Sequence, residues 1–195
     1  MAITPDFEWW LVKQYGDESI ASAFLIGNTT DRTYFAFLNL IGYLPPQYNF
    51  SLNPYPDLRF SSCPDCGHKT GQRKLPLLIH IDPFHLIALN YTCRYCRHCD
   101  MLIGHKDELE HLLTTMCAQY DPSVIGNDYL IIGTVEKKAW REGLIQPKSV
   151  ADMLPQTHDF KSYQEIRMTM GGWFRADQEP PVMSLPPSTE WIKRR

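Results

Sequence analysis

Two apolar stretches in the middle of the chain are separated by a short turn. Residues 75–81 (LPLLIHI) and 85–92 (HLIALNYT) flank Asp82-Pro83-Phe84, and this arrangement is typical of a β-hairpin. A turn of about three residues places Ile81 opposite His85. The numbers of paired residues therefore add up to about 166 along the whole hairpin.

A helical pattern of apolar side chains follows the hairpin. Residues 105–120 (HKDELEHLLTTMCAQY) place apolar side chains every three or four positions, with Asp107 and Glu108 in the first turn. Asp121-Pro122 ends this helix, because proline has no backbone N–H to donate. The predicted apolar stripe consists of Leu109, Leu112, Leu113, Met116, Cys117 and Tyr120.

The N-terminal part of the chain is predicted to be mostly helical. Residues 4–16 carry helix start and stop signals, with a proline at the first helical position and a glycine at the end. Residues 17–27 and 31–46 indicate two more short helical segments, although β-branched and aromatic side chains leave a strand open at 31–46. Residues 47–62 are rich in Asn, Pro and Ser and are typical of a boundary.

Beyond residue 121 the pattern indicates a small α/β segment. Residues 128–134 predict a strand, and residues 135–142 predict a helix that Thr134 caps and Gly143 stops. A last strand is predicted at 168–174. The proline-rich residues from 176 onward predict an extended tail of the kind that lies on a neighbouring surface.

The six cysteines are unevenly placed, and five of them lie in two clusters. Cys63-Pro-Asp-Cys66 is followed about thirty residues later by Cys93, Cys96 and Cys99, so two CxxC frames compete for one partner. Two such knuckles offer four thiolates to a closed, tetrahedral zinc site. The hairpin register brings positions 100 and 103 opposite the first knuckle, whereas Cys93 faces residue 73. The predicted ligands of one structural zinc are Cys63, Cys66, Cys96 and Cys99.

The residue that follows each knuckle supports the same frame. This position often needs a positive φ, which Gly67 adopts without strain and Asp100 tolerates better than Arg97. Cys93 is then expected to be a buried core thiol, with a spare ligand as the alternative. Cys117 lies on the apolar helical stripe and is expected to be buried as well.

Residues 63–111 resemble the zinc ribbons of the YgiT-type antitoxin family. The shared pattern is the CPxC knuckle at 63–66, a β-hairpin, and a tyrosine-led CxxC followed by an acid at 95–100. The resemblance covers about a quarter of the chain and implies a structural zinc. In that family a helix-turn-helix domain follows an N-terminal ribbon, whereas here residues 1–62 precede the pattern and 121–195 show no helix-turn-helix.

These elements together predict an α+β protein. Its centre would be a zinc-ribbon β-hairpin with flanking helices, followed by a small C-terminal α/β segment. The expected organisation is a mostly helical segment at 1–60, the ribbon with its helix at 61–120, the α/β segment at 121–175 and a Pro-rich extended tail at 176–195.

Composition and charge narrow the class of protein. The 195 residues are 44% hydrophobic and 12% aromatic, which is enough to bury a core. No apolar run reaches the length of about 18 residues that a membrane span needs, and the first residues lack a signal-peptide pattern. A soluble cytoplasmic protein with reduced thiols is therefore expected. The net charge is −3, although residues 59–106 hold seven basic against three acidic side chains.

Catalysis and redox chemistry are not expected. The motif HIDPFH offers His80, Asp82 and His85, but strand alternation points the two histidines to opposite faces. A redox CxxC needs a helix N-terminus beside its thiolate, and the predicted helix starts too late for Cys96. The sequence therefore predicts a non-catalytic protein.

Two classes of partner are consistent with the sequence. A protein partner is favoured, because the chain has a Pro-rich tail and tryptophans at 9, 10, 140, 173 and 191, of which Trp191 lies beyond the predicted core. The protein would then act as a protein-binding or adaptor module. The alternative is a transcription- or antitoxin-related nucleic-acid-binding protein, whose basic residues would be Lys69, Arg73, Lys74, Arg94 and Arg97.

Overall fold

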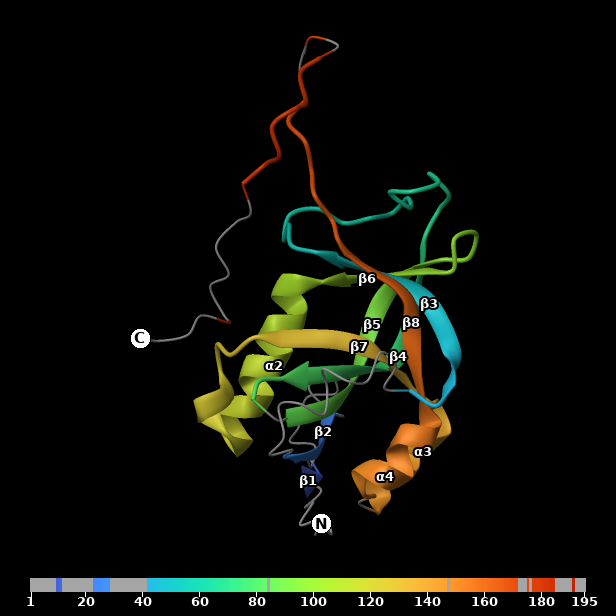
Figure 1. The fold of residues 1–195 in the computed structure, drawn as a ribbon, viewed down its shortest axis with the longest axis vertical. Helices are drawn as coiled ribbons and strands as arrows, with labels where there is room; N and C mark the ends of the chain where they lie inside the picture. The colour runs from blue at the N-terminus through green and yellow to red at the C-terminus, as the bar shows by residue number, and fades with distance from the viewer. Residues whose placement is uncertain are drawn as a thin grey trace.

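Six strands of the protein form a sheet that closes on itself (Figure 1). The computed structural model describes residues 10–11, 23–28, 42–83, 85–146, 148–171, 175, 177–184 and 191. The neighbours follow the order β5-β4-β7-β8-β3-β6, and β6 pairs again with β5. The strands are Leu44–Asn53 (β3), Gly71–Ile81 (β4), His85–Cys96 (β5), Met101–His105 (β6), Tyr129–Val135 (β7) and Thr157–Glu165 (β8).

The predicted fold class is wrong, because the protein is a closed six-stranded β-barrel and not a zinc-ribbon hairpin with flanking helices. The predicted hairpin does form from β4 and β5, but both of its outer edges are paired. β7 pairs with β4, and β6 pairs with the end of β5. Unpaired backbone N–H and C=O groups at a strand edge favour pairing with a further strand. The sequence pattern of a hairpin does not show which distant segments will pair with its edges.

Strand β3 is the element that the sequence pattern most misplaced. Residues 31–46 and 47–62 predict a short helical segment and a boundary, yet Leu44–Asn53 is one of the strands of the barrel. Both neighbours of β3, β6 and β8, are parallel to it. The sequence of β3, LPPQYNFSLN, contains two prolines and two asparagines, which are depleted in strands, so its local strand signal is weak.

Other strands also lie where helices or loops were predicted. Ala23–Asn28 (β2) is a strand that pairs with the first half of β5, and Trp10–Leu11 (β1) pairs with β2. Strand β8 has no counterpart in the predictions. The rest of the N-terminal predictions, and residues 172–174 of the predicted last strand, lie outside the described residues.

The helix and strand predictions of the second half of the chain hold better. The helix Lys106–Tyr120 (α2) and strand β7 are confirmed, and α2 ends before Asp121-Pro122 as predicted. The helix Lys137–Ile145 (α3) begins after Glu136 instead of Thr134 and continues past Gly143. Short helical turns follow α2 and α3, and these are Pro122–Val124 (η1), Val150–Met153 (α4) and Leu154–Gln156 (η2).

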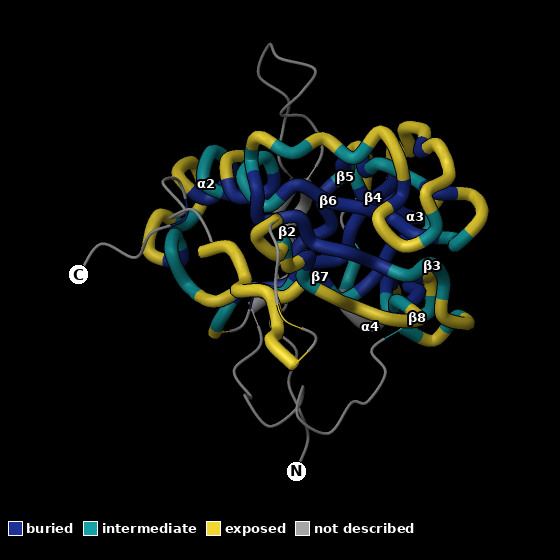
Figure 2. The backbone as a smooth tube through the Cα atoms, turned by 90° about the horizontal axis from the view of Figure 1, so that it is seen from above, coloured by how far each residue is buried: buried dark blue, intermediate teal, exposed yellow. Residues whose placement is uncertain are grey.

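The β4–β5 hairpin has the predicted register. Gly71 pairs with Tyr95 and Ile81 with His85, so each pair of residue numbers adds up to 166. One face of the hairpin packs against α2, and the other face packs against α3 and α4. Figure 2 shows most of β4, β5 and β6 buried at the centre of the molecule, while parts of β3 and β8 are exposed. Among the described residues, no helix has the length and apolar character needed to cross a membrane.

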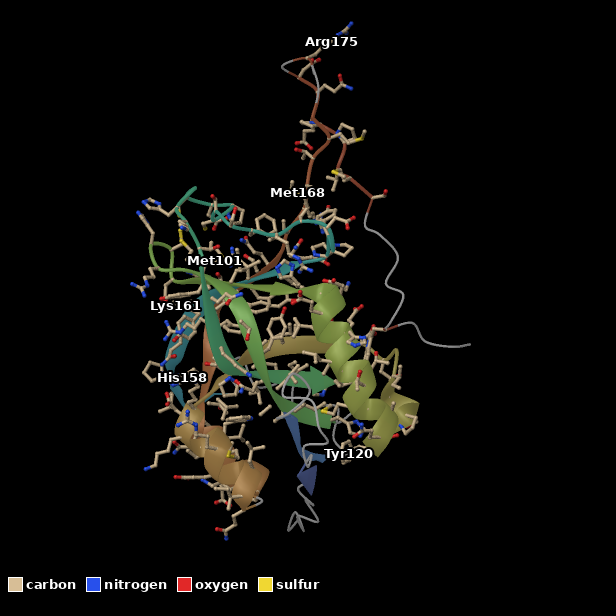
Figure 3. All side chains as sticks on the ribbon, turned by 180° about the vertical axis from the view of Figure 1, so that it is seen from behind. Met101, Tyr120, His158, Lys161, Met168 and Arg175 are labelled. Carbon is tan, nitrogen blue, oxygen red and sulfur yellow. The ribbon has the colours of Figure 1, made fainter. Side chains whose placement is uncertain are left out.

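The end of the chain folds back along itself and does not simply extend. Thr169 and Val182 form a β-bridge, and Met183 N donates to Met168 O across 2.8 Å. These two segments form an arm that leaves the barrel, with Arg175 near its outer end (Figure 3). Trp191 then lies in the main hydrophobic core. The predicted segments 1–60, 61–120 and 121–175 thus all contribute strands to one barrel. From the predicted tail 176–195, Trp191 packs in the core of this barrel.

Candidate metal centre and adjoining pocket

Four cysteine sulfurs meet beyond one end of the barrel. The Sγ atoms of Cys63, Cys66, Cys96 and Cys99 all lie within 4.8 Å of one another. The Cys63 and Cys99 sulfurs are 3.9 Å apart, and those of Cys66 and Cys96 are 3.6 Å apart. The group could hold a metal ion, and the structure brings together the four residues that the sequence selected.

The two knuckles approach each other because the strands fix their positions. Cys96 is the last residue of β5 and pairs with Met101, so Cys99 lies in the turn that closes the barrel through β6. Cys63 and Cys66 lie in the loop that leads into β4. In the first knuckle Cys63 N donates to His68 O across 2.8 Å, and Gly67 N donates to Cys63 O across 2.9 Å.

The residues that follow the knuckles have the predicted backbone conformation. Gly67 has a φ of 72° and Asp100 a φ of 52°. The second knuckle is also fixed by β3, because the Asn49 side chain donates to Cys99 O and the Asn49 backbone N–H donates to Asp100 O, each across 2.9 Å. The long-range contact of Asn49 had no signal in the sequence, since residue 49 lay in a predicted boundary.

The sulfur geometry fits a tetrahedral ion. Zinc–thiolate bonds of about 2.3 Å at tetrahedral angles separate neighbouring sulfurs by about 3.8 Å. The observed separations of 3.6 and 3.9 Å bracket that value. Four thiolates are also soft ligands, which Zn²⁺ and iron accept and Mg²⁺ or Ca²⁺ do not.

The thiols differ in how readily they lose a proton. Hydrogen bonds from the Cys99 thiol and the His68 backbone N–H lower the pKa of Cys66 to about 6. The hydrogen bond to Cys66 raises the pKa of Cys99, and burial raises that of Cys63. Cys66 therefore loses its proton more readily than Cys63 or Cys99. Neighbouring thiolates repel one another, and a bound cation offsets this repulsion.

The two remaining cysteines are core residues, as predicted. Cys93 is fully buried, pairs with Arg73 in the hairpin and packs in the main core. Burial raises its pKa, so this thiol stays neutral and is not a spare ligand in this geometry. Cys117 is buried on α2, and burial raises its pKa to about 12.

An open pocket of about 910 Å³ adjoins the cysteine cluster. Three of its lining residues are cationic, none is acidic, and both knuckles contribute to it. Gly71 and Tyr95, which pair across the hairpin, form part of its wall. The full lining is His68, Lys69, Thr70, Gly71, Gln72, Arg73, Tyr95, Arg97 and His98.

Arg73, one of the lining residues, packs against two tyrosine rings. The Arg73 guanidinium lies 4.9 Å from the ring centre of Tyr48 and 4.7 Å from that of Tyr95. The two rings meet edge to face, with centroids 5.9 Å apart. Tyr48 has a φ of 55°, an unfavourable conformation for an aromatic residue, and such strain is concentrated at functional sites.

The structure separates the five predicted basic residues into two groups. Lys69, Arg73 and Arg97 line the pocket. Lys74 pairs with Thr92 further along the hairpin, and Arg94 donates to Phe60 O across 3.1 Å. Tyr48 and His68 were missed, because their contacts with Tyr95 and His98 join positions about 47 and 30 residues apart in the sequence.

The two hairpin histidines do not share a site. His80 Nδ1 lies 3.7 Å from Asp82, whereas His85 Nε2 lies 3.4 Å from Asp121 at the end of α2. Burial lowers the pKa of both side chains. By strand alternation, His80 shares a face with Leu78, and His85 shares the opposite face with Ile79. Leu78 and Ile79 belong to different hydrophobic cores, so the predicted opposite orientation of the histidines is confirmed.

The structure describes the side chains of two of the five tryptophans. Trp140 and Trp191 are both buried in the chain's own cores. Trp9 and Trp173 lie outside the described residues, as does the side chain of Trp10.

Comparison with known proteins leaves the chain without an assigned family. No family model matches it, and no curated protein and no solved structure is similar to it. The resemblance of residues 63–111 to YgiT-type zinc ribbons accordingly stays a prediction.

Proposed function

We propose that the protein is a non-catalytic zinc protein in which one Zn²⁺ joins the two knuckles. The observation that carries this proposal is the set of four sulfurs at tetrahedral spacing. All four ligands come from the chain, so no coordination position is left for water or a substrate. The ion is structural, and it holds the turn through which β5 and β6 close the barrel.

Metal content in matched cysteine variants tests the proposal. Elemental analysis of the purified protein should find one zinc per chain. Cys96→Ser should lose it, because Cys96 is a ligand, whereas Cys93→Ser should keep it. Zinc retained in Cys96→Ser but lost in Cys93→Ser would refute the ligand set. Hydrolytic activity lost in Cys66→Ser while the fold stays intact would refute the structural role.

The protein acts by binding another protein through its C-terminal arm. Three apolar side chains of this arm are exposed to solvent, Met170 and Val182 by 54% and Met183 by 43%. Exposed apolar groups that lie together mark interaction surfaces. The arm also projects from the barrel, so its side chains are accessible to a partner with a matching apolar surface (Figure 3).

Point substitutions are a better test of the arm than truncation at Ala176. Truncation would also remove Trp191, which belongs to the core. In affinity purification, the Met170→Lys/Val182→Lys protein should lose partners that the unaltered protein retains. Ile145→Lys is the matched control, because Ile145 is 85% exposed on α3. If the arm variant and the Ile145→Lys control retain the same proteins, the arm is not the binding surface.

A further inference from the structure

We infer that the pocket beside the metal centre binds single-stranded nucleic acid, with phosphates at Lys69, Arg73 and Arg97 and a base against Tyr95. This inference is independent of the protein partner proposed for the arm. It requires only that the two knuckles be held together, since residues of both line the pocket.

The charge of the pocket favours an anion. Lys69, Arg73 and Arg97 give three positive charges, whereas zinc with four thiolates carries −2 in total. The nearby Asp100 is already neutralised by Lys161, whose Nζ lies 2.7 Å from its carboxylate. The thiolate charge is partly buried, while Lys69 and Arg97 are exposed. A phosphate that enters the pocket therefore meets the cations first.

The guanidinium of Arg73 is already positioned for recognition. It lies over the rings of Tyr48 and Tyr95, so little side-chain freedom is lost when it binds a phosphate. Arg73 lines the open pocket, and a guanidinium carries five N–H donors that can reach a phosphate oxygen there. The Tyr95 hydroxyl donates to Asp100 across 2.9 Å, which fixes the plane of the second ring.

The aromatic wall distinguishes a nucleotide chain from a simple anion. Bases of single strands are free to stack on tyrosine rings and arginine planes, whereas bases of a duplex are stacked on one another. Tyr95 is half-buried, so part of its ring remains accessible in the pocket. His68 and His98, with ring centroids 4.2 Å apart, supply further flat surfaces and hydrogen-bond donors beside it.

The same histidines form another candidate set with Cys66, and a second metal ion there is disfavoured. The donor atoms of Cys66, His68 and His98 lie within 4.8 Å of one another. Cys66 is shared with the four-cysteine set, and the two histidines line the same pocket as the cationic Lys69, Arg73 and Arg97. This environment repels a cation and attracts an anion.

Fluorescence anisotropy with a labelled single-stranded RNA of about 12 nucleotides tests the inference. Three phosphate contacts predict that log K falls against log salt with a slope of about −2. Lys69→Ala/Arg97→Ala should reduce the slope to about −0.7. Lys138→Ala should leave it unchanged, since Lys138 lies on α3 with a side chain that is 89% exposed.

The aromatic contribution is tested separately. Tyr95→Leu should weaken binding about tenfold or more, whereas Tyr95→Phe keeps the ring and most of the affinity. A duplex of the same sequence and inorganic phosphate should compete poorly. Absence of binding at 50 mM salt by the zinc-loaded, folded protein would overturn the inference. An unchanged slope in the double variant, or equal competition by duplex or phosphate, would also overturn it.

Discussion

Trp191 donates its indole N–H to the carbonyl oxygen of Asn127 across 2.6 Å, and its ring meets that of Tyr129 edge to face with centroids 5.8 Å apart. The side chain is 8% exposed and lies in the same core as α2 and the inner strands. The residue that the sequence suggested as an anchor for a partner therefore anchors the chain to itself.

Loss of the Trp191 side chain should destabilise the protein strongly. Trp191→Ala removes a buried ring and is expected to lower the free energy of unfolding by about 3–5 kcal/mol. Trp191→Phe keeps much of the apolar contact but leaves Asn127 O without its donor, and should cost about 1–3 kcal/mol. Urea unfolding of both variants gives these values. Unchanged stability in Trp191→Ala would show that the indole is not part of the core in solution.

Gly133 of β7 pairs with Asp159 of β8 and lies close to the β8 backbone. A Cβ atom at this position would lie 2.0 Å from the carbonyl oxygen of His158, which belongs to the backbone of β8. We expect Gly133→Ala to separate these two barrel strands and to prevent folding or lower the melting temperature sharply. Gly171→Ala is the matched control, because a Cβ there meets nothing within 4 Å. Equal melting temperatures would contradict the β7–β8 register.

If the four cysteines hold the proposed zinc, its removal should destabilise the turn between β5 and β6. A chelator is expected to lower the melting temperature of the unaltered protein, because metal binding contributes to folding free energy. The Cys63→Ser/Cys66→Ser variant should already be less stable and should not respond to the chelator. Circular dichroism melts with and without chelator measure both. A chelator response in the double variant would place the stabilising ion elsewhere.

The buried His105 should make stability depend on pH. Burial lowers its pKa below the ordinary value of about 6.5, and its Nδ1 lies 2.9 Å from the Asn53 amide nitrogen, a donor that needs a neutral acceptor. The unfolded chain then binds more protons below about pH 6.5, so stability is complete above that pH and is lost as the pH falls.

The pH dependence can be assigned with one substitution. His105→Gln keeps an acceptor for Asn53 but does not titrate. The decrease in urea midpoint between pH 7.5 and pH 5 should therefore be smaller in this variant than in the unaltered protein. Some decrease should remain, because burial also lowers the pKa of His80 and His85. If the urea midpoint decreases equally in both proteins, His105 does not contribute to the pH dependence of stability.

The sequence was sufficient to predict the features that depend on residues close together in the chain. The hairpin register follows from a three-residue turn, and it led to the choice of Cys96 and Cys99 over Cys93. Helix α2 is recognisable from its periodicity and from Asp121-Pro122, although Tyr120 of its predicted stripe is 40% exposed.

The closed barrel could not be predicted in the same way. Its seams join residues such as Phe50 with Leu102 and with Tyr163, and no local pattern links those positions. For the same reason Tyr48 and Asn49, which approach the second knuckle from β3, were not recognised as part of the site. Trp191 illustrates the converse, since a tail position in the sequence became a core position through long-range packing.

The parallel pairing of β3 has a consequence for how the protein emerges from the ribosome. Phe50 pairs with residues 52 and 113 positions further along the chain, at Leu102 and Tyr163. At synthesis rates of about 5–20 residues per second, the second partner appears on the order of ten seconds after the first strand. During that interval a segment with unpaired backbone groups is open to chaperones or to other nascent chains. Co-translational folding of this protein should therefore be delayed until β8 has been made.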